Sequence, residues 1–164
     1  MRALAPALWL SLPLALTSCS LFGGGAATVE ARFAFDPPAT AAGLAFGVAV
    51  ETESDTRTLS QGDFRAVGER QFDADPLTVA ARPARITCTV GRGGVESAVT
   101  VEVDLQDDWR YGVSCRVSER DPEDGCFGCR GSAVAALDPA LGYDPALRLG
   151  VAWGGDPRDS GVVY

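Results

Sequence analysis

Three runs of alternating apolar and polar residues within residues 85–118 constrain the fold of this chain more than any other feature. In the second run Val99, Val101 and Val103 alternate with polar or acidic residues. A period of two is that of a β-strand with one buried face. Turn-forming residues 91–94 and 106–108 separate the runs. The sequence therefore predicts three consecutive antiparallel strands, a β-meander.

The rest of the chain adds shorter segments of the same kind. No window shows the 3.6-residue apolar period of an amphipathic helix. We expect an all-β fold, an antiparallel β-sandwich of about seven to eight strands, loosely immunoglobulin-like or transthyretin-like in outline. Residues 52–75 are expected to form a polar loop with one short strand. The expected strands outside the meander are residues 29–35, 44–51, 64–67, 77–81, 132–137, 147–153 and 161–164.

The first 18 residues form a separate segment. Arg2 is followed by an apolar run that ends at Leu16, and two small residues then precede Cys19. The run of about 14 residues is shorter than the roughly 20 that cross a bilayer, and it is typical of a secretory signal. The tetrapeptide Leu16-Thr17-Ser18-Cys19 resembles the lipobox of bacterial lipoproteins.

This resemblance implies an anchor and a location. Cys19 would carry palmitate or another acyl chain on its sulfur, and a signal peptidase would cut before it. Residues 1–18 are then the signal peptide, residues 19–28 a lipidated flexible tether rich in glycine, and residues 29–164 a single domain. Ser20 follows the cysteine, where aspartate favours the inner membrane. We therefore expect a bacterial cell-envelope protein held to the outer membrane by its lipid, facing the periplasm or the cell surface.

The composition excludes several classes of function. The formal net charge is -8, which argues against a nucleic-acid partner. The chain contains no His and no Lys, so it cannot form a Ser-His-Asp triad, an imidazole metal site or a lysine Schiff base. We expect no catalytic residue, no metal and no cofactor. Chemistry that relies on carboxylates remains open.

The four cysteines after Cys19 predict two disulfides, because an even number is expected in an oxidising compartment. Cys126-Phe127-Gly128-Cys129 is the sharpest motif. A thiol-disulfide exchange site would place its first cysteine at a helix N-terminus. Here the motif follows a turn in a β pattern, so a structural disulfide is the better interpretation. A c-type haem site needs His directly after the second cysteine, and Arg130 stands there. A structural zinc site usually shows two close cysteine pairs, whereas this chain has only one.

The pairing of the four cysteines is open from the sequence. Cys88 and Cys115 both lie on the apolar phase of their strands, which favours Cys88–Cys115 together with Cys126–Cys129. In a flat meander, however, the first and third strands lie roughly 9.5 Å apart. A disulfide needs Cα atoms within about 7 Å. If the meander is flat, Cys126 and Cys129 reach back to Cys115 and Cys88 instead.

Two further groups of side chains have a functional and a structural interpretation. Acidic clusters at residues 104–108, 119–124 and 156–159 could bind calcium, but none has the spacing of an EF-hand loop, so solvated turns are favoured. Aromatic residues could form a ligand-stacking surface, yet three of them lie on the apolar phase of their strands and are better assigned to the core. These aromatic residues are Trp109, Tyr111, Trp153 and Tyr164.

These observations favour a non-catalytic envelope lipoprotein that binds a protein or a glycan or supports an assembly. Two alternatives remain from the sequence. The first is a thiol-disulfide oxidoreductase that uses Cys126 and Cys129. The second is a carboxylate-dependent envelope hydrolase. The ligand itself cannot be derived from these residues.

Overall fold

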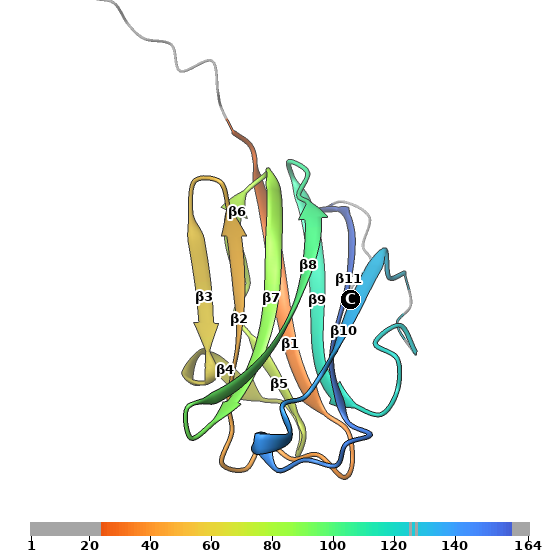
Figure 1. Ribbon diagram of the computed structural model, residues 1–164. Coiled ribbons are helices and arrows are strands. Elements are labelled where there is room, and N and C mark those ends of the chain that lie inside the picture. The colour runs from red at the N-terminus through yellow and green to blue at the C-terminus, as the bar shows by residue number, and fades with distance from the viewer. Residues whose placement is uncertain (1–23, 125, 127, 159–164) are drawn as a thin grey trace, which may run out of the picture.

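The computed structural model describes residues 24–124, 126 and 128–158, and this part of the chain is almost entirely β-structure. Two sheets pack face to face as a sandwich (Figure 1), which confirms the predicted class. Eleven strands occur in the described residues, more than expected. They are β1 (Ala26–Phe35), β2 (Ala45–Thr52), β3 (Thr56–Ser60), β4 (Phe64–Ala66), β5 (Gln71–Ala74), β6 (Leu77–Ala80), β7 (Pro83–Arg92), β8 (Val95–Asp104), β9 (Trp109–Ser118), β10 (Gly131–Ala136) and β11 (Arg148–Pro157), with 3-10 turns η1 (Gln61–Asp63) and η2 (Pro139–Leu141).

Each sheet has a clear strand order. Sheet A has the order β10-β11-β9-β1-β5-β4, with β6 also paired to β1. Sheet B has the order β3-β2-β7-β8. All pairings are antiparallel except β1 with β9, which is parallel over eight residue pairs from Thr28↔Arg110 to Phe35↔Val117. The N-terminal strand is therefore an interior strand of sheet A.

The expected meander is correct for its first two strands and wrong for the third. β7 and β8 form a hairpin closed by Gly93 and Gly94, both at positive φ, as a tight two-residue turn requires. β9 then crosses to sheet A instead of pairing with β8. Leu105, only 2% exposed, is buried where the chain crosses between the sheets. The Tyr111 hydroxyl fixes this crossing, since it accepts from the Gln106 N–H at 2.8 Å and donates to the Asp104 carbonyl at 3.2 Å.

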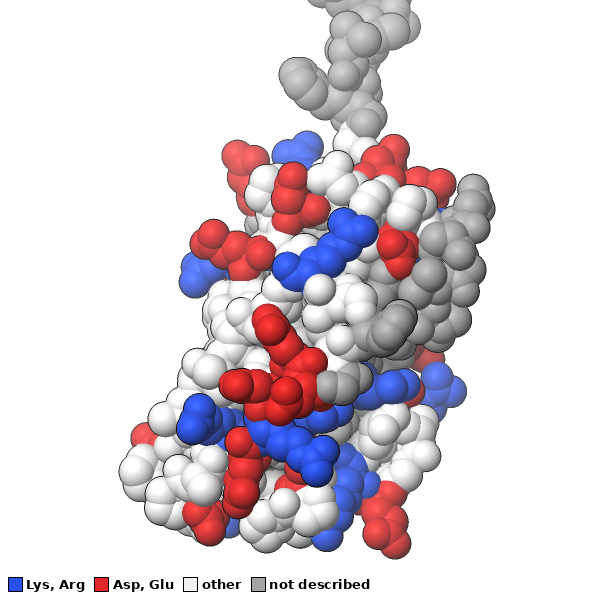
Figure 2. Space-filling model, turned by 90° about the vertical axis from the view of Figure 1, so that its right-hand side faces the viewer, with Lys and Arg blue, Asp and Glu red and all other residues white. Residues whose placement is uncertain are grey.

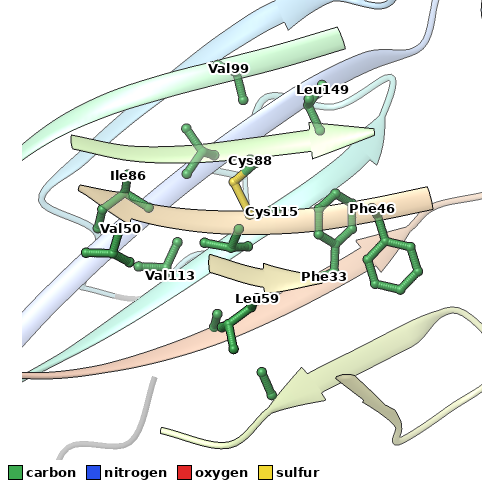
Figure 3. Close-up of a cluster of buried hydrophobic side chains, with 14 of the residues drawn as sticks. Phe33, Phe46, Val50, Leu59, Ile86, Cys88, Val99, Val113, Cys115 and Leu149 are labelled. Atoms are coloured by element: carbon green, nitrogen blue, oxygen red, sulfur yellow. A yellow bond between two sulfur atoms is a disulfide. The ribbon is translucent and has the colours of Figure 1, made fainter. Parts of the chain in front are cut away.

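The crossing brings Cys88 of β7 opposite Cys115 of β9. Both residues are fully buried, and their disulfide joins the two sheets through the core with Cα atoms 5.9 Å apart (Figure 3). The preferred pairing is thus confirmed, and the objection from a flat meander does not apply because the strands lie in facing sheets. Aromatic rings fill the core toward one end of the sandwich, including Phe33 and Phe46 with ring centroids 4.9 Å apart.

The polar region after β2 contains more structure than expected. The short strand β4 is confirmed, but β3 and β5 were not predicted. In β3 only Leu59 is buried, because this strand forms the edge of sheet B and exposes its other residues. One buried residue gives no period-two signal. β1 begins at Ala26, three residues before the expected strand, and its extra residues pair with β6. Residues 161–164 lie outside the described part.

Candidate functional site

Cys19, the last residue of the tetrapeptide that resembles a lipobox, lies outside the described residues, but the place where the chain enters the fold is defined. Ala26 is the first strand residue, and it comes seven positions after Cys19. Its N–H donates to the Asp107 carboxylate at 2.9 Å, and its carbonyl accepts from the Asp108 N–H at 2.9 Å. Two residues of the predicted acidic cluster 104–108 thus hold the chain at the end of the sandwich where it enters.

The Cys126–Cys129 pair is a disulfide in the loop between β9 and β10, with Cα atoms 5.7 Å apart. Both cysteines are half-buried. No α-helix occurs in the described residues, so none places its N-terminus at this pair. The dipole that commonly lowers a redox thiol's pKa therefore has no source in this part of the chain. The pair is thus a disulfide in a loop, without the helical context that is typical of a redox site.

The same loop forms one wall of a groove on the outer face of sheet A. We call this the outer groove. It is an open cavity of about 550 Å³, and β1 and β5 form its opposite wall. Its floor comes from β9, which pairs with β1, and from β11, which pairs with the other edge of β9. Its lining includes Glu30, Arg32, Ser114, Arg116, Asp124 and Ala152.

The floor of the outer groove consists of small residues at adjacent register positions. Gly112 pairs with Gly154, and Ser114 pairs with Ala152. The loop rests on the floor through Pro122, because a Cβ added at Gly150 would lie 2.9 Å from the Pro122 Cβ. A larger residue would push the loop away from β11. The small residues thus let the loop sit close to the sheet and leave the groove beside it.

The walls carry charges of both signs. Arg32 of β1 donates two hydrogen bonds to Asp73 of β5, at 2.7 and 3.0 Å. These hydrogen bonds raise the pKa of the Arg32 guanidinium above its usual value. Glu30 lies 3.3 Å from the Arg110 Nε, which is buried and has no hydrogen-bond partner of good geometry. Of these two ion pairs at the groove wall, Arg32–Asp73 is therefore hydrogen-bonded and Arg110–Glu30 is not.

Arg116 and Asp124 differ from these pairs. The closest carboxylate to Arg116 is Asp36 at 3.8 Å, and Arg116 donates no hydrogen bond to any described residue. Its side chain is 31% exposed. Asp124 is exposed, and its carboxylate has no ion-pair or hydrogen-bond partner among the described residues. One cationic and one anionic group on the groove lining are thus available to a ligand.

The outer groove was not predicted from the sequence, although one signal was present. The polar phase of residues 109–118 reads Arg110, Gly112, Ser114 and Arg116, so two small residues stand between two arginines. On a solvated face, larger polar side chains are usual in strands, because Gly is depleted there. Such a pattern indicates close approach to another group. The opposite wall, however, comes from β1 and β5, whose position depends on the sheet order.

The aromatic residues belong mainly to the core. Tyr111 is 1% exposed, while Trp109 and Trp153 are half-buried and pack against the core. The Tyr111 ring lies 6.0 Å from that of Trp109 and 6.1 Å from that of Trp153. None of these rings lines the outer groove. Tyr164, the fourth aromatic considered, is outside the described residues.

The acidic clusters that were considered as alternative calcium sites do not form a metal-ligating group in the described residues. No group of three or more metal-ligating His, Cys, Asp or Glu side chains occurs among them. Figure 2, the side of the molecule that carries β10, shows acidic and basic side chains interspersed rather than separated. A wider hollow of about 610 Å³ lies over sheet B near Glu51 and Glu102, but it is more open than the outer groove. We therefore take the outer groove as the candidate site.

Comparison with known proteins does not assign this chain to a family. No family model, no curated protein and no solved structure matches it. Among the residues that the structure describes, no helix has the length and apolar character needed to cross a membrane. A proposal about function therefore depends on the chemistry of the outer groove and of the N-terminal segment.

Proposed function

We propose that this chain is a lipid-anchored, non-catalytic binding module of the bacterial cell envelope, and that the outer groove is its binding surface. The observation that carries the proposal is the groove itself. It combines a floor of small residues with the available charges of Arg116 and Asp124. Concave sites with a few placed polar groups are the usual form of ligand sites. The partner is an envelope protein or a glycan.

The arrangement suits binding better than catalysis. Glu30 and Asp73 line the groove, but each is paired with an arginine. Hydrolysis by two carboxylates needs one acid and one base, both directed at the substrate. Of the carboxylates named on the lining, only Asp124 lacks an arginine partner among the described residues. The Cys126–Cys129 pair lies in a loop, and no α-helix of the described residues is present to activate one of its thiols for exchange chemistry.

The attachment and the location rest on the N-terminal segment. The lipobox supports acylation at Cys19, and Ser20 supports the outer membrane as the destination. The short distance along the chain between Cys19 and β1 would hold the sandwich close to the bilayer. Seven residues span at most about 25 Å when fully extended.

The attachment is tested with Cys19→Ala. Cells are labelled with radioactive palmitate and fractionated. We expect label and membrane association in the unaltered protein and neither in the variant. Label and membrane association retained in Cys19→Ala would overturn the proposed anchor.

The binding surface is tested by site-specific photocrosslinking in living cells. A benzophenone amino acid replaces Gln71 on the β5 wall of the groove, where it leaves the floor open, or, as the control, Thr58 on the exposed face of β3. We expect a discrete crosslinked product from position 71 and none from position 58. The same pattern of products at both positions, or no product at position 71, contradicts the assignment of the groove.

A further inference from the structure

We propose that the outer groove takes a short extended peptide segment whose carboxylate binds Arg116. This inference rests on the proposed binding function and adds the chemistry of the ligand. It is argued from the length of the groove floor, from the hydrogen-bonding state of its charged groups and from the side chains that the lining lacks.

The floor has the length of a short peptide. Gly112, Ser114 and Arg116 line the groove from the same face of β9, and the first and last of them are four positions apart. At about 3.3 Å per residue this separation is about 13 Å. Gly112 and Ser114 allow a ligand backbone to approach the sheet closely. An extended segment of about four residues fits this length.

Arg116 has the donors that a carboxylate needs. A guanidinium has five N–H donors and binds carboxylates in a bidentate manner. In Arg32 two of these donors are already used on Asp73. In Arg116 the 3.8 Å approach to Asp36 is too long for a hydrogen bond, so its donors remain for a ligand. Because the side chain is half-buried, a carboxylate bound there is less screened by water than at the surface.

The remaining lining favours a peptide over other anionic ligands. Asp124 offers a counter-charge for an ammonium group, and Glu30 and Asp73 would repel a polyanion such as a nucleic acid. Stacking on an aromatic ring is a common element of sugar recognition, but among the described residues no aromatic side chain lines the groove. A peptide carries both charges and a backbone that suits the narrow floor.

The test uses the full-length protein purified in detergent micelles and tetraalanine with free termini as the probe. Binding is measured by isothermal titration calorimetry against tetraalanine and against its C-terminal amide. We expect saturable binding of the free acid and at least about tenfold weaker binding of the amide, a difference of about 1.4 kcal/mol. Arg116→Gln should weaken binding of the free acid by the same factor.

Two further variants make the result specific. Arg57→Gln removes the same charge from β3 of sheet B and should bind tetraalanine like the unaltered protein. Ser114→Trp fills the groove floor and should abolish binding, while circular dichroism and the melting temperature confirm that it folds. Because Ser114 is half-exposed, this change does not insert a ring into the core.

The outcomes separate this inference from the proposed function. Equal binding of the free acid and the amide, or equal binding by the Arg116→Gln and Arg57→Gln variants, overturns the role of Arg116. Absence of tetraalanine binding together with a crosslink at position 71 overturns the peptide assignment and retains the groove as a binding surface. Absence of both overturns the proposed function as well.

Discussion

The Cys88–Cys115 disulfide leads to a prediction of large effect. The double variant Cys88→Ala, Cys115→Ala removes the covalent link between the two sheets. The two cysteines of this link are 27 positions apart in the sequence. With that loop length, the chain-entropy expression gives about 3.6 kcal/mol of stabilisation. Both sulfurs are fully buried, so the cavity left by their loss adds to this cost. The free energy of unfolding should therefore fall by at least about 3 kcal/mol.

A matched control is available in the same chain. The Cys126–Cys129 ring has a separation of only three positions, for which the same expression gives about 1.6 kcal/mol. Both cysteines are half-buried, so their loss creates little cavity. The double variant Cys126→Ala, Cys129→Ala should thus be clearly the more stable of the two. The difference between the variants, rather than either value alone, measures the link between the sheets.

The measurement is equilibrium unfolding in urea, followed by tryptophan fluorescence, since Trp109 and Trp153 pack against the core. For an m-value of about 1.5 kcal/mol per M, the midpoint of the Cys88/Cys115 variant should shift by about 2 M. Equal midpoints for the two double variants would refute the reasoning, because they would show that joining the sheets has no special value.

Two other perturbations follow from contacts in sheet A. Gly155→Ala should destabilise by about 1–3 kcal/mol in thermal melts, because the new Cβ would lie 2.5 Å from the Tyr111 ring; Gly62→Ala, with nothing within 4 Å, should be neutral. Burial raises the pKa of Tyr111. The contribution of its neutral hydroxyl to the free energy of unfolding is therefore fully present below about pH 10, and it is lost as the pH rises through the higher folded-state pKa. Tyr111→Phe should cost about 1–2 kcal/mol at pH 7, by leaving the Gln106 N–H unsatisfied, and should flatten the alkaline part of the stability curve. A stability loss above pH 10 that is identical in Tyr111→Phe contradicts this origin.

The sandwich was predictable because apolar and polar residues alternate along several of its long strands, and this alternation indicates one buried face. β8 and β9 alternate so regularly that the fold class and the approximate strand boundaries followed directly. The strand order did not follow, because alternation identifies a buried face but not the sheet that covers it. Residues 106–108 look like a hairpin turn, and only the buried Leu105 and the Tyr111 hydroxyl show that the chain crosses between sheets.

The candidate site was less accessible to sequence reasoning. Arg116 lies on the predicted polar face of β9, where exposed arginines are ordinary. Its significance comes from neighbours far away in sequence, such as Asp36, which directly follows β1. The parallel pairing of β1 with β9 brings these groups together, and parallel pairing of two strands about 80 residues apart has no local sequence signature.

The interior position of β1 has a mechanical consequence. A force applied through the residues that precede Ala26 pulls along the axis of this strand. Its hydrogen bonds to β9 on one side, and to β5 and β6 on the other, run across that axis. Such a pull shears these bonds together instead of opening them one at a time, so the whole sheet shares the load. At its N-terminal end the domain is therefore built to withstand tension.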